Sequence, residues 1–148
     1  RNGNETTYLY DGQGRLTQIA GPGGHSLTLT WENGRVTAIS DPAGNTVRYG
    51  YDASRNLVKV TAPDGSETRF SYDAQHRLTD RVSPLGARTR YEYTADGRVA
   101  RILVAESEAA TPVTVASYDY GTAHKVARRT NALGRTWTYT YVYIGSKG

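Results

Sequence analysis

The sequence predicts an all-β protein, a continuous antiparallel meander of short β-hairpins. Aromatic residues recur in two columns along the chain, and Gly, Pro, Asp and Asn recur between them. Aromatic and β-branched residues favour strands, and the intervening residues mark a turn about every ten residues. No segment keeps a 3.6-residue apolar period, so no helix is expected.

Two aromatic columns define a repeat of about 21 residues. The first column holds Tyr8, Leu29, Tyr49, Phe70, Tyr91, Tyr118 and Tyr139, and the second holds Tyr10, Trp31, Tyr51, Tyr72, Tyr93, Tyr120 and Tyr141. All but one of these are aromatic, in a chain with twelve Tyr, two Trp and one Phe. Because side chains two residues apart share a strand face, we expect both columns on one face, with rings of adjacent repeats stacked.

A turn follows the second aromatic column. Asp opens this turn in three repeats, a basic residue closes it in five, and an aliphatic residue comes next. The residues are Asp11, Asp52 and Asp73; Arg15, Arg35, Arg77, Arg98 and Lys125; and Leu16, Val36, Leu57, Leu78, Val99 and Val126. An Asp at the start of a turn accepts backbone N–H groups, which explains its recurrence.

A second turn completes each repeat. It contains a glycine column, and a proline precedes the glycine by two residues in four repeats. The residues are Gly24, Gly44, Gly65, Gly86 and Gly134, with Pro22, Pro42, Pro63 and Pro84. Each repeat is therefore strand, turn, strand, turn, as in residues 46–51 followed by residues 56–61.

The second strand of each repeat departs from strict alternation. Leu16 and Ile19 are three residues apart, as are Val36 and Ile39. Residues three apart in a regular strand point to opposite faces. Either a bulge lies between them or both faces of the sheet are partly covered.

Composition excludes several functional classes. Apolar residues make up 37% of the chain, so the aliphatic core is thin and tyrosines carry much of the burial. The net charge is +4, but basic residues are dispersed among acidic ones, which argues against a nucleic-acid surface. The absence of Cys excludes a disulfide framework and a thiol nucleophile.

No apolar run approaches the ~20 residues of a membrane span. The chain starts at Arg1, contains no Met and shows no signal peptide, so we expect it to be part of a longer protein. We expect residues 1–148 to be a single array fragment of about seven repeats, with an irregular insertion at residues 103–115.

The repeating unit resembles the YD repeat of Rhs proteins. The resemblance rests on residues 51–57 (YDASRNL), residues 72–78 (YDAQHRL) and, more closely, residues 10–16 (YDGQGRL). It extends from about Tyr8 to Tyr143. It departs where the Asp is replaced, at Glu32, Thr94, Gly121 and Val142. Similar repeats occur in bacterial Rhs toxins, wall-associated YD proteins, insecticidal toxin-complex C components and animal teneurins.

The resemblance implies a long β-sheet that spirals into a hollow shell, of which this chain is a curved segment. In the bacterial toxins that shell encloses a C-terminal effector, so the expected partners are the rest of the shell and the effector. The alternative is a cell-surface adhesion or carbohydrate- or protein-binding segment of a wall-associated protein. Both imply a secreted or surface-exposed protein.

Candidate catalytic residues all have structural explanations, so the sequence predicts no enzyme, no cofactor and no metal site. The aspartates Asp11, Asp52, Asp73, Asp96 and Asp119 recur too regularly for a single catalytic centre. His76 and His124 lie two repeats apart in expected turns, and His25 is isolated. Asp41-Pro42-Ala43-Gly44 matches one element of the self-cleavage motif of Rhs toxins, but it lies in the ordinary turn column and the second element is absent.

Three surfaces remain open. The Tyr and Arg columns are expected to stabilise the fold, with sugar or peptide binding as the alternative. The insertion at residues 103–115 is either a functional loop or neutral drift. Strands near Thr6–Tyr10 and Thr136–Tyr143 are expected to be sheet edges, which predicts edge-to-edge self-association.

Overall fold

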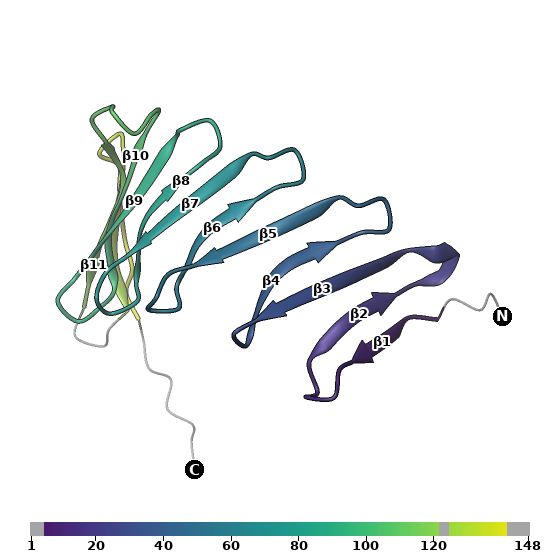
Figure 1. Cartoon of the computed structure of the whole chain (residues 1–148). Coiled ribbons are helices and arrows are strands. Elements are labelled where there is room, and N and C mark those ends of the chain that lie inside the picture. Colours follow the sequence, from purple (N-terminus) through teal and green to yellow (C-terminus); the bar gives the residue numbers. More distant parts are fainter. Residues whose placement is uncertain (1–4, 122–124, 142–148) are drawn as a thin grey trace, which may run out of the picture. The chain divides into compact units, whose positions relative to one another are not determined.

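Thirteen strands form one antiparallel sheet in the computed structural model of the chain, which describes residues 5–121 and 125–141 (Figure 1). Neighbours in the sheet are neighbours in the sequence. The strands are β1 (Thr7–Tyr10), β2 (Leu16–Ala20), β3 (Ser26–Glu32), β4 (Arg35–Ser40), β5 (Thr46–Tyr51), β6 (Leu57–Thr61), β7 (Glu67–Tyr72), β8 (Leu78–Val82), β9 (Arg88–Tyr93), β10 (Val99–Ala105), β11 (Val113–Tyr120), β12 (Val126–Asn131) and β13 (Thr136–Thr138). The expected all-β meander is confirmed.

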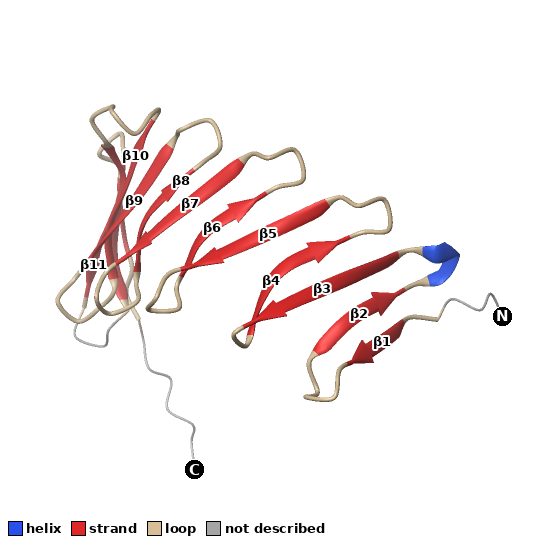
Figure 2. Cartoon of the chain, in the orientation of Figure 1, coloured by secondary structure: helices blue, strands red, loops and turns tan. Residues whose placement is uncertain are grey.

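The chain forms two compact units, residues 1–70 and residues 71–148. Strands β1 to β6 belong to the first unit and β8 to β13 to the second, while β7 crosses the boundary. Within the described residues, the one helical element is a 3-10 turn, η1 (Pro22–Gly24), drawn in blue in Figure 2. No described helix has the length and apolar character needed to cross a membrane.

A β-bulge resolves the irregular spacing in the second strands. Tyr10 pairs with Leu16 and Leu9 pairs with Gln18, so Thr17 is an extra residue without a partner of its own. The same shift occurs in the β3–β4, β5–β6, β9–β10 and β11–β12 pairs. Each bulge brings the two aliphatic residues onto the same face as the two aromatic columns, where they pair with the aromatic residues of the neighbouring strand. Of the two alternatives left open by the sequence, the bulge is therefore the one that occurs.

Most hairpins close through one type of loop. In the loop after β4, the N–H of Gly44 donates to Asp41 O at 3.1 Å, and the N–H of Asp41 donates to Asn45 O at 3.0 Å. Gly44 is the fourth residue counted from Asp41 and the last of the three loop residues, and it has φ 88°. This is a three-residue hairpin loop in which a type I turn precedes a left-handed residue. That conformation explains the glycine column, because glycine adopts positive φ without a steric penalty.

The loop between β3 and β4 is one residue shorter. Glu32 pairs with Arg35, so Asn33 and Gly34 alone form the turn. Their φ values, 48° and 74°, are both positive, as a type I′ turn requires. Asn-Gly is the preferred sequence for that turn, and the missing residue explains why Trp31 and Tyr51 are 20 residues apart rather than 21.

The sheet has two chemically different faces. Tyr49 pairs with Val60 and Tyr51 with Leu57, so aromatic and aliphatic side chains share one face, here called the aromatic face. The alternate residues, such as Arg48 opposite Thr61, lie on the other, here called the polar face. Among the described residues, the buried apolar side chains are limited to Ala38, Val82, Ala105 and Ala116.

The accessible surface is large for a chain of this mass. It amounts to 10544 Å², whereas a globular chain of 16.2 kDa exposes about 7,500 Å². No fully buried large side chain occurs in the described part of the chain. The stability of the sheet therefore depends on contacts between neighbouring strands within one layer.

The insertion lengthens two strands as well as a loop. β10 continues to Ala105 and β11 begins at Val113, which leaves residues 106–112 as the loop. A further bulge lies between Ile102 and Leu103.

The terminal strand is shorter than expected. β13 ends at Thr138, although the N–H of Tyr139 still donates to Ala127 O at 2.8 Å. Residues 142 and 143 of the expected strand lie outside the described residues.

Candidate functional site

A recurring contact on the aromatic face joins several repeats to the ones before them. The guanidinium of Arg77 lies 4.6 Å from the centre of the Tyr93 ring. The hydroxyl of Tyr93 donates a hydrogen bond to Leu78 O at 2.6 Å. Arg77 and Leu78 close the turn and begin the second strand of one repeat, and Tyr93 belongs to the next. We call this arrangement of a cation, a carbonyl and an aromatic ring the interlock.

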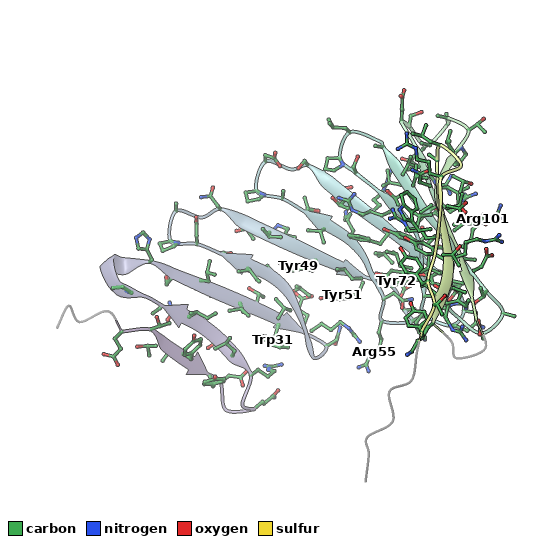
Figure 3. All side chains as sticks on the ribbon, turned by 180° about the vertical axis from the view of Figure 1, so that it is seen from behind. Trp31, Tyr49, Tyr51, Arg55, Tyr72 and Arg101 are labelled. Carbon is green, nitrogen blue, oxygen red and sulfur yellow. The ribbon has the colours of Figure 1, made fainter. Side chains whose placement is uncertain are left out.

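The interlock recurs in both units. The aromatic residue is always in the second column, and the cation is the turn-closing residue of the preceding repeat. The cation–ring pairs are Arg15 with Trp31 (5.7 Å), Arg35 with Tyr51 (5.3 Å), Arg98 with Tyr120 (4.9 Å) and Lys125 with Tyr141 (4.7 Å). The hydrogen bonds are Trp31 to Leu16 O, Tyr51 to Val36 O and Tyr120 to Val99 O. Trp31, Tyr49 and Tyr51 are labelled in Figure 3.

The interlock corrects the expectation that rings of adjacent repeats stack directly. A second strand lies between every two first strands, so equivalent rings are separated by two strand spacings, or roughly 10 Å. A cation from the preceding repeat fills that gap. Cation–π contacts contribute about 0.5–1 kcal/mol each at exposed sites, and the hydrogen bond adds to this.

Two tyrosines of the interlock, Tyr93 and Tyr120, have a raised pKa. Burial raises the pKa of the Tyr93 hydroxyl, and the nearby negative charge of Asp73 raises it further. Burial likewise raises the pKa of Tyr120. A neutral hydroxyl is the form that donates to the carbonyl, so these shifts favour the bonded state.

Asp at the first turn performs the structural role predicted for it. Asp11 Oδ1 accepts the backbone N–H groups of Gln13 at 2.8 Å and Arg15 at 3.0 Å. Its Oδ2 accepts the Arg15 side chain at 2.7 Å. The backbone and side-chain hydrogen bonds from Arg15 hold the pKa of Asp11 below its ordinary value. The carboxylate thus fixes the same arginine that stacks on the next ring.

The same geometry recurs at two further aspartates. Asp73 accepts hydrogen bonds from the backbone and side chain of Arg77, and Asp52 accepts them from Asn56. Burial opposes ionisation of Asp73, but the hydrogen bonds from Arg77 outweigh it and lower its pKa.

Two other aspartates of the recurring set, Asp96 and Asp119, do not lie at the start of a turn. Asp96 lies inside its turn rather than at its start, where Thr94 takes the capping place and accepts the N–H of Arg98 at 3.0 Å. Asp119 lies within β11 and forms an ion pair with Arg128 at 2.6 Å. The turn-start explanation therefore holds for Asp11, Asp52 and Asp73 but fails for these two.

Two of the three histidines, His25 and His76, lie among the described residues. His76 occupies the left-handed position of its turn, with φ 60°, where Gly14 and Gly97 stand in other repeats. His25 is an exposed residue after η1. His124 lies outside the described residues. Among those described, no group of three or more His, Cys, Asp or Glu side chains is placed to hold a metal ion.

Asp41, in the segment that resembles a self-cleavage element, is a turn residue. Its carboxylate accepts the backbone N–H of Asn45 at 2.8 Å and the Asn45 side-chain amide at 2.7 Å. The Asn45 side chain is the main cause of the lowered pKa of Asp41. This is the arrangement seen at Asp52, so the geometry shows a turn capped by its first residue.

The polar face carries ion pairs between adjacent strands. Asp80 accepts Arg88 at 2.5 Å and Arg90 at 3.2 Å, and Glu92 pairs with Arg101 at 2.5 Å. Lys59 and Glu67 form such a pair in the first unit at 2.9 Å. Opposite charges on neighbouring strands are thus paired on this face.

Comparison with known families identifies the repeat. The RHS Repeat family matches residues 1–26, 31–67, 56–88 and 72–109, which together cover more than half of the chain. The chain belongs to the RHS repeat family. The resemblance to YD-repeat proteins is thereby confirmed. A search of curated proteins found no match to the chain.

Solved structures share the fold of this RHS repeat chain. A crystal structure of TcdB2-TccC3 superposes with a TM-score of 0.70 at 15% identity, over 82% of this chain and 7% of that chain. A structure of a Photorhabdus luminescens Tc holotoxin pore gives 0.64 at 18% identity, over 88% of this chain and 6% of that one. The chain therefore spans less than a tenth of the length of these proteins, and the similarity shows the fold.

The interlock is the feature that sequence reasoning missed. The three columns that form it (the basic, the aliphatic and the second aromatic column) are each visible in the sequence, but as separate patterns. Their signal is a constant separation: the aromatic residue follows the accepting aliphatic residue by 15 positions at Trp31, Tyr51 and Tyr93. At Tyr120 the separation is 21, because the insertion lies between the two partners.

Proposed function

We propose that the chain is a structural segment of the β-shell that encloses the effector of a bacterial Rhs-type toxin. The observation that carries this proposal is an RHS repeat sheet in a single layer, joined from repeat to repeat by the same interlock. A wall needs continuity along the sheet rather than a specialised pocket. Each interlock supplies that continuity on the aromatic face, and ion pairs supply it on the polar face.

The single array is the functional unit in this proposal, with residues 1–148 forming one continuous stretch of wall. No catalytic, cofactor-binding or metal-binding residue is assigned to it, because Asp11, Asp41, Asp52 and Asp73 all cap turns. Its partners are the remaining shell and the enclosed effector. A shell of this kind works outside the producing cell, so we place the protein among secreted or surface-exposed proteins.

Adhesion at a cell surface is the alternative. Tyr8, Tyr10, Trp137, Tyr139 and Tyr141 are more than 40% exposed, and exposed aromatic rings are suited to stacking on sugars or peptides. These residues lie in or just after the two terminal first strands, whereas Tyr51, Tyr93 and Tyr120 are partly buried by the interlock. Exposure is thus concentrated where a repeat lacks a neighbour, which favours the structural role.

Protease protection in the full-length product of the gene tests enclosure. The region that follows the repeats should resist a protease concentration that digests the same region expressed alone. Cleavage of both at equal rates would contradict the proposal. In parallel, glycan-array binding by the chain, lost on Trp137→Ala, would support adhesion instead.

A further inference from the structure

The insertion between β10 and β11 forms one wall of a pocket in the second unit (Figure 1). The cavity has a volume of about 440 Å³, within the range of ligand sites in proteins. Val104 and Val113, which pair across the two strands, are 38% and 60% exposed there. Contiguous exposed apolar surface with a polar rim is typical of an interaction site. The lining residues are Ala87, Val104, Ala105, Glu106, Ala110, Thr111 and Val113.

Glu106 contributes the single ionisable group among these lining residues. It is exposed, and it forms no ion pair or hydrogen bond with the residues that the structure describes. Arg88 lies opposite Ala105 in the sheet, but it is held by Asp80 at 2.5 Å. Residues 103–115 contain two glutamates and no Lys, Arg or His, in a chain with a net charge of +4. The pocket therefore combines apolar walls with a carboxylate that lacks a cation.

Two exposed leucines lie in the loops on either side of the insertion. Leu85, between β8 and β9, is 94% exposed, and Leu133, between β12 and β13, is 79% exposed. Both loops lie at the same end of the sheet as the insertion, because all three join a second strand to the next first strand. The same turn position holds Gly23, Ala43 and Asp64 in the first unit. The exposed leucines are thus a feature of the second unit, with the pocket between them.

We propose that the insertion pocket receives a lysine side chain of a partner polypeptide, whose flanking apolar residues contact the two leucines. A lysine side chain has an apolar stem and a charged end. The stem lies against Val104 and Val113, and the ammonium pairs with Glu106. The leucines extend the contact surface beyond the pocket, which favours a polypeptide over a free amine.

The spacing of the three loops predicts the pattern of the partner sequence. Equivalent loops of adjacent repeats are separated by two strand spacings, or roughly 10 Å. An extended chain covers that distance in three residues, at about 3.3 Å each. The partner segment therefore reads Leu or another aliphatic residue, two residues of any kind, Lys, two residues of any kind, and a second aliphatic residue. This inference rests on the insertion and does not depend on whether the sheet encloses an effector.

Peptide titration followed by amide NMR tests the pocket. The probe is capped Leu-Ser-Thr-Lys-Thr-Ser-Leu, and its control carries norleucine in place of lysine, which keeps an apolar stem and removes the charge. The lysine peptide should shift the amides of residues 104–113 and bind about threefold more tightly than the control. Glu106→Gln should abolish that difference. Glu108→Gln removes the same charge from the same loop, outside the pocket lining, and should preserve the difference.

Four results would overturn the proposal. Equal binding of both peptides would show that the pocket accepts an aliphatic side chain without recognising charge. No shift with either peptide at millimolar concentration would show that the pocket is closed to a polypeptide. Loss of the difference in both glutamate variants would show a general attraction to the acidic loop. Butylamine binding as tightly as the lysine peptide would show that a free amine is the ligand.

Discussion

At the scale of single residues, one arginine links a turn to the next repeat. Arg77 is held by Asp73 on one side and lies over Tyr93 on the other. The carboxylate orients the guanidinium, so the ring meets a cation whose position is already fixed. The Asp, the Arg and the second aromatic therefore form one unit, although they are far apart in the sequence.

Tyr93→Phe tests the hydrogen bond of the interlock. The substitution keeps the ring under Arg77 and removes the donor to Leu78 O. We expect a loss of about 1 kcal/mol in the free energy of unfolding, measured by urea denaturation. Tyr91→Phe is the control, because the Tyr91 hydroxyl makes no hydrogen bond within the described residues, and it should cost a few tenths at most. Equal losses of unfolding free energy in the two variants would show that the Tyr93 hydrogen bond does not stabilise the sheet.

Asp11→Asn tests how much the negative charge of Asp11 contributes to the stability of the protein. The folded-state pKa of Asp11 is lowered, so its stabilising effect is present above the unfolded pKa of about 4 and is lost as pH falls through the folded value. Asn keeps the turn geometry, as Asn131 shows by accepting the N–H groups of Leu133 and Arg135. The variant should lose stability at pH 7 and show a weaker decline between pH 5 and pH 2. An unchanged pH profile would contradict a role for the charge.

At the scale of elements, loops determine the regularity of the repeat. Both turns of the third repeat use the same loop with a left-handed fourth residue, at Arg55 and at Gly65. The shared geometry keeps successive hairpins in register even where the sequence varies, because Arg55 and His76 adopt the same conformation.

Gly65→Ala measures what that conformation costs. Gly65 has φ 84°, and an added Cβ would meet no atom within 4 Å, so the penalty is backbone strain alone. We expect about 1–2 kcal/mol of destabilisation in urea unfolding. Gly12→Ala is the matched control, because Gly12 is equally open but does not have positive φ. It should be neutral or slightly stabilising. A neutral Gly65→Ala would refute the conformational explanation of the glycine column.

The sequence predicted elements better than the contacts between them. Strand 46–51 was located correctly because alternation and turn residues are local signals. The bulge at Thr17 remained one of two alternatives, since a bulge is a property of a strand pair. The interlock was missed because its partners are 15 residues apart and meet only once the sheet has formed. The sequence alone groups Asp119 with the turn aspartates, because the strand register that places it in β11 cannot be read from the sequence.

At the scale of the whole molecule, contacts between repeats take the stabilising role that a buried core has in a globular protein. Few side chains are buried, so each repeat is stabilised chiefly by its neighbours. Edge-to-edge self-association stays a prediction.

Double-mutant cycles test most directly the central claim that the interlock couples adjacent repeats. Cycles of Arg35→Gln with Tyr51→Leu and of Arg77→Gln with Tyr93→Leu should each give a coupling of about 0.5–1 kcal/mol in the free energy of unfolding. The crossed cycle of Arg35→Gln with Tyr93→Leu should give none. Additive effects in both matched cycles, or equal coupling in the crossed one, would contradict the account.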